Sequence, residues 1–241
     1  MGLTSFYLTN ELYLSIFNLL IVTILAFLIS LKVDRLYQFS NHKGIRLFRH
    51  AFLFFSVAFF TQAIILIAGI WIVPPISKSS LSPLAIRLFI GVLHMIFAYT
   101  ITLSGFYIVY SLIWKKVNSS SKFVTKIKIL SIHLIAFAIA IIYIFFPGIS
   151  VHFLFIPQLC VLSYGIYVCY NKYQNIRKHN RQGFLQLYLI TLILMFIGWF
   201  FNYITGFVRS IYKLFPLYTQ ILTLGIFVIF IYGVMKITKR F

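Results

Sequence analysis

Two apolar segments of the sequence carry small and polar side chains that recur at the spacing of one helix face. In both segments these residues lie three or four positions apart, and at about 100° per residue this keeps them on one side of a helix. The first set is Arg87, Gly91, His94, Ala98, Thr102 and Gly105, and the second is Thr191, Met195, Gly198, Asn202, Thr205 and Arg209. Such a face either packs closely against another helix or forms one wall of a ligand pocket. The spacing alone leaves both interpretations open.

The segments that carry these residues are long enough to cross a membrane. Hydrophobic residues make up 62% of the 241-residue chain and charged residues only 10%, whereas about a quarter of an ordinary soluble domain is charged. A membrane-spanning helix needs about 20 apolar residues. We expect spans at about residues 10–31, 46–73, 83–114, 129–146, 151–171, 184–205 and 214–236. The sequence therefore predicts an all-α, polytopic membrane protein with a single seven-transmembrane-helix domain over residues 1–241.

The fourth and fifth of these spans come from one uninterrupted apolar run. Residues 129–171 contain no charged side chain, and as a single helix they would extend about 65 Å, roughly twice the thickness of a bilayer core. Phe146-Pro147-Gly148 supplies a turn near the middle of the run. We therefore expect two helices here. The basic segment between the first two spans, Lys32 to Arg49, is expected to be partly helical and to be interrupted at His42-Lys43-Gly44.

The lysines and arginines determine the expected orientation. Four of the 21, Lys78, Arg87, Arg209 and Lys213, fall on one side of the predicted bundle, and all the others fall on the opposite side. Loops rich in Lys and Arg remain in the cytoplasm. We therefore expect the N-terminus outside, the C-terminus in the cytoplasm, and the protein in the plasma membrane. The cytoplasmic face is expected to attract anionic lipid, and no nucleic-acid-binding motif accompanies its charge.

Polar side chains within the predicted spans gather in their outer halves, while the inner halves are mostly aliphatic and aromatic. Ser15 and Asn18 in the first span and Gln62 in the second add to this polar set. The asymmetry favours a polar cavity that opens to the outside. The candidate ligand-binding residues are Glu11, Arg87, His94, Gln158, Asn202, Arg209 and Gln220.

The two arginines in this set suggest an anionic ligand at the outer mouth. A guanidinium group suits carboxylate and phosphate, so Arg87 and Arg209 are the expected anion contacts. Two alternatives remain open from the sequence. Glu11 could pair with Arg87, or both arginines could extend to water at the level of the lipid headgroups.

Several membrane chemistries are disfavoured by the residues that are missing. Glu11 and Asp34 are the two acids of the chain, and neither is expected at membrane depth, which argues against proton-coupled transport and carboxylate catalysis. His94 and His133 are expected at different depths, so they make a poor pair of haem ligands. A retinal Schiff base would need a lysine within residues 214–235, which contain none. We expect no enzymatic activity, no metal and no cofactor.

These observations favour a sensor-like or receptor-like protein, or a ligand-binding membrane subunit, with an outward-facing polar pocket. Such a protein would signal through separate membrane or cytoplasmic protein subunits. A small-solute transporter or channel subunit is the alternative, and a structural subunit of a larger membrane complex is a third class.

Overall fold

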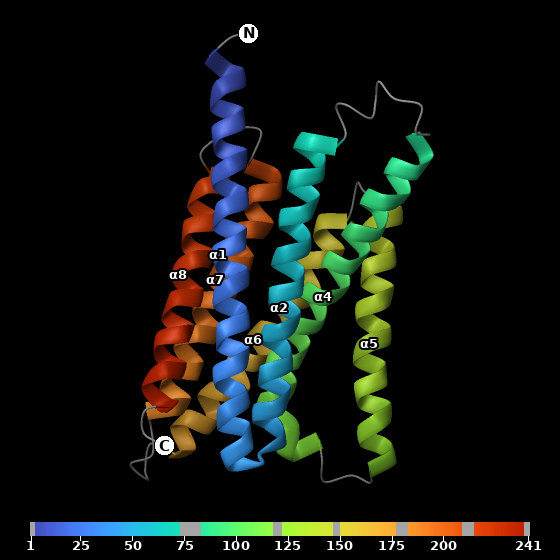
Figure 1. Ribbon diagram of the computed structural model, residues 1–241. Helices are drawn as coiled ribbons and strands as arrows, with labels where there is room; N and C mark the ends of the chain where they lie inside the picture. The colour runs from blue at the N-terminus through green and yellow to red at the C-terminus, as the bar shows by residue number, and fades with distance from the viewer. Residues whose placement is uncertain are drawn as a thin grey trace.

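The computed structural model describes residues 3–72, 83–117, 122–146, 150–176, 183–208 and 215–238, and the secondary structure in these residues is entirely helical (Figure 1). The elements are α1 (Leu3–Ser40), α2 (Lys43–Ile67), a π-helical turn η1 (Ala68–Ile72), α4 (Pro83–Val117), α5 (Lys122–Phe145), α6 (Ser150–Ile176), α7 (Gly183–Val208) and α8 (Phe215–Thr238). Within these described residues, seven helices contain segments of 18 to 28 residues that are long and apolar enough to cross a membrane. The all-α class and the number of such helices are confirmed, and the orientation stays a prediction.

Most helices agree with the predicted spans, and the long apolar run is divided as expected, because α5 ends at Phe145 and α6 begins at Ser150. The largest difference is in the first helix. The predicted span ended at Leu31, and the helical part expected in the connection after it is a direct continuation of α1 to Ser40. Residues 32–40 contain no glycine or proline that would end a helix. The added turns are stabilised by a hydrogen bond from Gln38 Nε2 to Asp34 Oδ2 at 3.2 Å.

The connection between α1 and α2 is a tight turn at the predicted place. Asn41 has a φ of 50°, a left-handed conformation that asparagine tolerates better than most residues, and its backbone N–H donates to the Tyr37 carbonyl at 2.8 Å. Three residues later Gly44 lies directly against α4. A β-carbon at this position would come within 2.9 Å of the Ser111 carbonyl oxygen and of the Trp114 ring. The turn therefore needs a glycine where α2 meets α4.

The helices run alternately up and down, so the bundle has two distinct ends (Figure 1). The upper end in Figure 1 holds the beginnings of α1, α4, α6 and α8 together with the ends of α2, α5 and α7. The lower end holds the turn between α1 and α2 and the last residues of α8. α1 packs between α2 and α8, α7 packs between α6 and α8, and α4 contacts α2, α5 and α6.

Aromatic side chains fill the centre of the bundle. We refer to the following six residues as the phenylalanine cluster: Phe48, Phe52, Phe55, Phe59, Phe227 and Phe230. All six are buried, and Phe52 and Phe55 have no exposed surface. Neighbouring rings of the cluster meet mostly edge to face or tilted, with centroids 4.9 to 6.5 Å apart, as aromatic pairs prefer. The cluster joins α2 to α8.

The long helix α4 leans across the bundle, so that its upper part lies beside α5 and away from α1 (Figure 1). Its lower half is deeply buried, and Ala98, Thr102 and Leu103 have no exposed surface. A close approach to α6 occurs at Gly165, where a β-carbon would lie 2.8 Å from the Val109 side chain. The lean determines which residues of α4 can face the interior near the upper end.

Candidate functional site

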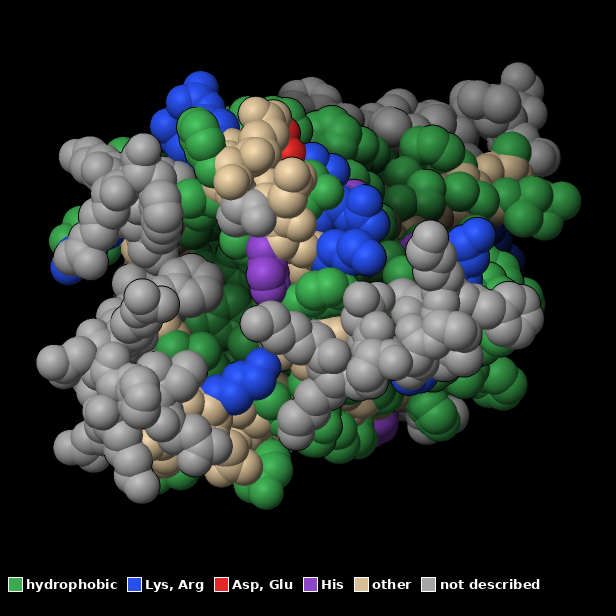
Figure 2. Space-filling model, turned by 90° about the horizontal axis from the view of Figure 1, so that it is seen from below, with side chains coloured by type: hydrophobic (Ala, Val, Ile, Leu, Met, Phe, Trp, Pro, Cys, Tyr) green, Lys and Arg blue, Asp and Glu red, His purple; other side chains and the backbone are tan. Residues whose placement is uncertain are grey.

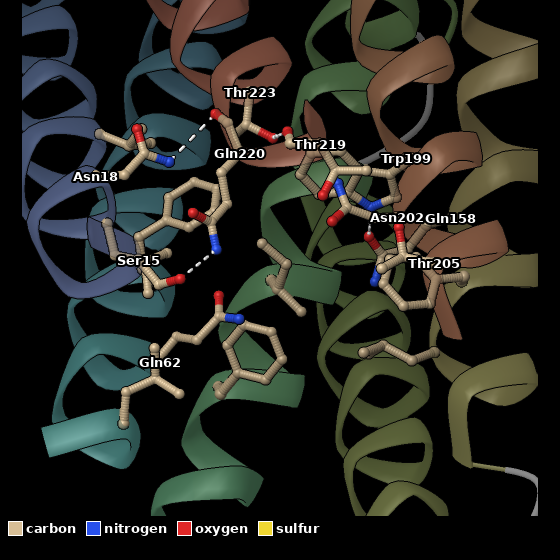
Figure 3. Close-up of a pocket in the computed structure, with 18 of the residues that line it drawn as sticks. Ser15, Asn18, Gln62, Gln158, Trp199, Asn202, Thr205, Thr219, Gln220 and Thr223 are labelled. Atoms are coloured by element: carbon tan, nitrogen blue, oxygen red, sulfur yellow. Dashed lines mark hydrogen bonds between the residues drawn. The ribbon is translucent and has the colours of Figure 1, made fainter. Parts of the chain in front are cut away.

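A partly open cavity of about 260 Å³ lies between the upper halves of the helices; we call it the upper cavity (Figure 3). Six helices contribute to its wall, and α5 contributes none of the described lining residues. Its polar lining is formed by Ser15, Asn18, Gln62, Gln158, Asn202, Thr205, Thr219, Gln220 and Thr223. Its apolar lining includes Leu12, Leu19, Val22, Phe59, Leu66, Phe97, Ile101, Leu154, Phe155 and Trp199.

One side of the upper cavity is formed by α1 and α8, which hydrogen bonds hold together. Gln220 Nε2 donates to Ser15 Oγ at 2.7 Å, and Asn18 Nδ2 donates to the backbone carbonyl of Gln220 at 3.2 Å. Figure 3 shows these three side chains grouped together, with Gln62 of α2 pointing into the same space. Residues about 200 positions apart in the sequence therefore form one polar wall.

The opposite side is centred on Gln158 of α6, which is 1% exposed. The indole N–H of Trp199 donates to Gln158 Oε1, and Gln158 Nε2 donates to Thr102 Oγ1 at 3.4 Å. Asn202 lies about one helical turn closer to the upper end of the bundle than Trp199 on α7. Its Nδ2 donates to the Gly198 carbonyl at 2.9 Å. Figure 3 shows Gln158, Trp199 and Asn202 together on this side. Helices α4, α6 and α7 are thus joined at the inner end of the cavity.

Two glutamines of the cavity wall have polar groups without a partner within the described residues. The Oε1 atom of Gln220 is buried and accepts no hydrogen bond, and the Gln62 side chain makes none in the part of the chain that the structure describes. Buried polar groups are nearly always hydrogen-bonded in folded proteins. An unmatched acceptor in a cavity wall therefore indicates that water or a ligand completes it.

The upper cavity carries no charge on its described lining residues. Below it, the phenylalanine cluster fills the bundle. Phe59 belongs both to the lining and to the cluster, and the Trp199 ring meets Phe55 edge to face at 5.7 Å. The cavity therefore ends on buried aromatic rings and has its polar groups toward the upper end.

The structure brings together three of the seven predicted site residues, Gln158, Asn202 and Gln220, in the upper cavity. It does not bring Arg87 and His94 to that cavity. Because α4 leans outward, Arg87 is exposed, and His94 stacks on Tyr143 of α5 at 6.2 Å while its Nδ1 lies 2.8 Å from the Ile90 carbonyl.

The two remaining candidates, Glu11 and Arg209, have side chains that lie outside the described residues. The alternative in which Glu11 pairs with Arg87 and the expected anion contact through Arg209 are therefore untested. The aromatic part of the cavity was not predicted at all. Trp199, Phe97 and Phe155 are three among 47 Phe, Tyr and Trp residues, and no spacing distinguishes them from core residues.

A second polar cluster links α4 to α5. The Tyr99 hydroxyl lies 2.7 Å from His133 Nδ1, and the Tyr107 hydroxyl lies 2.9 Å from His133 Nε2. A neutral imidazole accepts at one nitrogen and donates from the other, so both ring nitrogens are satisfied. No group of three or more His, Cys, Asp or Glu residues that could hold a metal ion occurs in the described part of the chain. The cluster therefore joins α4 to α5 through hydrogen bonds.

The lower end of the bundle is basic. Its described cations are Lys32, Arg35, Lys43, Arg46, Arg49, Lys126, Lys128, Lys172 and Lys236, and Figure 2 shows Lys and Arg side chains across this face. Arg49 forms an ion pair with Asp34, and the Lys43 ammonium lies 5.5 Å from the centroid of the Trp114 ring. At the upper end, Arg87 is the one cation whose side chain the structure describes. The charge asymmetry expected from the sequence is thus present in the fold.

Together these features define an all-helical bundle with seven helices of membrane-spanning length, a polar cavity at one end and a basic surface at the other. No protein-family model, curated protein or solved structure matches the chain. The arrangement of side chains is therefore the basis for assigning a function.

Proposed function

We propose that the protein is a receptor-like, ligand-binding protein of the plasma membrane, with its upper end outside the cell and its lower end in the cytoplasm. The upper cavity is the observation that carries this proposal. It collects carboxamides from five helices around one space, and binding sites are concave, largely apolar and furnished with a few convergent polar groups. The orientation is supported by the cations, which gather at the lower end.

Receptor-like binding is favoured over transport because the polar cavity does not continue through the bundle. The phenylalanine cluster occupies the space below it, and Phe55 at its centre has no exposed surface. A solute would have to displace several packed rings to pass. Binding at the upper cavity can instead change the packing of α1, α7 and α8, which extend to the basic lower end. A protein partner there would receive the signal.

Anionic lipid is a second partner that we propose for the lower end. Each Lys or Arg near an anionic leaflet contributes about 1 kcal/mol of attraction, and the described lower end holds many cations but only Asp34 as an acid. Purified protein would be placed in nanodiscs of phosphatidylglycerol or of phosphatidylcholine. A higher melting temperature in the anionic lipid, reversed by high salt, is expected; equal values in both lipids would contradict this part of the proposal.

The binding role is tested with the purified protein in neutral nanodiscs and a library of small metabolites. Ligands are detected by a rise in melting temperature and confirmed by equilibrium binding. Asn202→Leu and Gln220→Leu should each weaken the binding of a hit about tenfold or more, since both side chains line the upper cavity. Gln174→Leu is the matched control, because Gln174 is exposed near the lower end of α6.

Two results would overturn the receptor-like function. Hits whose binding is unaffected by Asn202→Leu and Gln220→Leu would place the site elsewhere. Uptake of the ligand into liposomes that contain the protein, at a rate well above that of empty liposomes, would make the protein a transporter instead.

A further inference from the structure

We propose that the upper cavity selects small, uncharged compounds that are rich in hydroxyl groups, such as polyols, rather than anions or cations. This inference rests on the proposed ligand-binding function and adds the chemical class of the ligand. It depends on which atoms of the carboxamides face the cavity and on the charge of the wall.

The protein itself determines how two of the carboxamides are turned. Asn18 Nδ2 donates to the backbone carbonyl of Gln220, and Asn202 Nδ2 donates to the backbone carbonyl of Gly198. A carbonyl oxygen can only accept a hydrogen bond, so in both side chains the nitrogen must be the atom that faces the backbone. The oxygens Oδ1 of Asn18 and Asn202 accept no hydrogen bond from the described residues and remain for a ligand.

Gln220 adds a third acceptor. Its Nε2 donates to Ser15 Oγ at 2.7 Å, and its Oε1 is buried without a donor. Leaving a buried acceptor unmatched destabilises a protein, and a ligand O–H in the cavity would remove that cost. The wall therefore presents carboxamide oxygens that can accept hydrogen bonds, and a ligand with several hydrogen-bond donors would match them.

Charge decides between the kinds of donor-rich ligand. A carboxylate or phosphate group presents only acceptors, which would face the oxygens of Asn18, Asn202 and Gln220, and no lysine or arginine is among the described lining residues to attract it. An ammonium group would be buried without a carboxylate in that same lining, and burying an unpaired charge is costly. Hydroxyl groups both donate and accept, so they also suit Gln62, whose amide offers both functions.

Size and surface agree with this class. The cavity volume of about 260 Å³ lies below the range of about 300–1,000 Å³ typical of drug-sized ligands, so the ligand is small. The aromatic side chains Phe97, Phe155 and Trp199 give the cavity apolar surfaces, against which the C–H groups of a polyol or a cyclic polyol can pack.

The test measures equilibrium binding to the wild-type protein in neutral nanodiscs with three sets of probes of similar size. The neutral set is erythritol, sorbitol and myo-inositol; the anionic set is succinate and glycerol phosphate; the cationic set is putrescine and choline. We expect binding from the neutral set, weakened about tenfold or more by Gln220→Leu and by Asn202→Leu and unchanged by Gln174→Leu. Gln220→Glu keeps the shape and adds an acid, so it should shift the preference toward putrescine.

The outcomes separate this inference from the proposed function. If an anion or a cation binds better than every polyol and is lost in Gln220→Leu, the cavity is a binding site but the ligand class is wrong. If no probe in the three sets binds and the metabolite library also yields no cavity-dependent hit, both the ligand class and the binding function are overturned. Equal binding of polyols to wild type and to both leucine variants would overturn the ligand class as well.

Discussion

Trp199 and Gln158 form a buried hydrogen bond at the inner end of the upper cavity, with the indole N–H of α7 donating to the carboxamide oxygen of α6. Trp199 is 6% exposed and Gln158 is 1% exposed. The same carboxamide donates onward to Thr102 of α4. One glutamine therefore satisfies buried polar groups from two neighbouring helices.

Replacing Gln158 by leucine should destabilise the protein. Gln158→Leu leaves the Trp199 N–H buried without an acceptor, which costs about 1–3 kcal/mol, and for a chain of this size each kcal/mol lowers the melting temperature by about 2–4 °C. Trp199→Phe removes the donor and keeps an aromatic ring. In the double variant the loss should be smaller than the sum of the single losses, because the two side chains share one bond. Additive losses would show that the bond contributes little.

The contact between α4 and α6 should depend on Gly165. A β-carbon there would lie 2.8 Å from Val109, so Gly165→Ala should push the helices apart and lower the melting temperature, and Val109→Ala should restore part of the loss. Gly105→Ala is the control, since Gly105 is also buried on α4 but has no atom within 4 Å of an added β-carbon. Equal effects of the two alanine substitutions would contradict the close approach.

The His133 cluster should contribute to the attachment of α5. His133→Phe removes the partner of both the Tyr99 and Tyr107 hydroxyls, and hydrogen bonds between transmembrane helices contribute about 0.5–1.7 kcal/mol. A double-mutant cycle of His133→Phe with Tyr107→Phe should give a coupling energy in that range, measured by unfolding in detergent. The control is His94→Phe, because His94 bonds to a carbonyl of its own helix. A coupling energy of zero would mean that the cluster does not stabilise the pair.

The orientation can be measured in intact cells by labelling single cysteines. In a background with Cys160→Ala and Cys169→Ala, Gln38→Cys would place a thiol near the lower end and Leu84→Cys would place one near the upper end; both positions are exposed. A membrane-impermeant maleimide should label Leu84→Cys in intact cells and Gln38→Cys only after lysis. The reverse labelling pattern would show that the protein has the opposite orientation in the membrane.

The sequence predicted the helices well because charge and helix-breaking residues mark their ends. The chain is so apolar that each basic segment marks a boundary between helices. Residues 129–171 contain no charge, and there Pro147-Gly148 identified the boundary between α5 and α6. The end of α1 was missed for the complementary reason. The connection from Lys32 to Arg49 was expected to be partly helical, but the charges at Lys32, Asp34 and Arg35 placed the end of the span at Leu31, whereas charged residues continue a helix readily where nothing interrupts it.

The candidate site was predicted in part, since depth in the membrane selected Gln158, Asn202 and Gln220. Helix spacing also selected Arg87 and His94. The spacing shows which residues share one face of a helix, but it does not show how that helix is tilted against its neighbours. The lean of α4 arises from contacts between helices, including Gly165 against Val109, and it carries His94 toward Tyr143. Which polar face borders a cavity therefore depends on tertiary packing that the sequence pattern does not record.

The length of α1 has a mechanical consequence. Its 38 residues form a rod of about 57 Å without a single glycine or proline. Ser15 and Asn18, which line the upper cavity, lie about 10 Å and about 5 Å above the midpoint of the rod, and Asp34, which pairs with Arg49, lies about 19 Å below it. A tilt of about 10° around the midpoint would move Ser15 by about 2 Å and Asp34 by about 3 Å in the opposite direction. α1 is thus a lever, which can transfer a displacement at the cavity to the basic surface without breaking any of its own backbone hydrogen bonds.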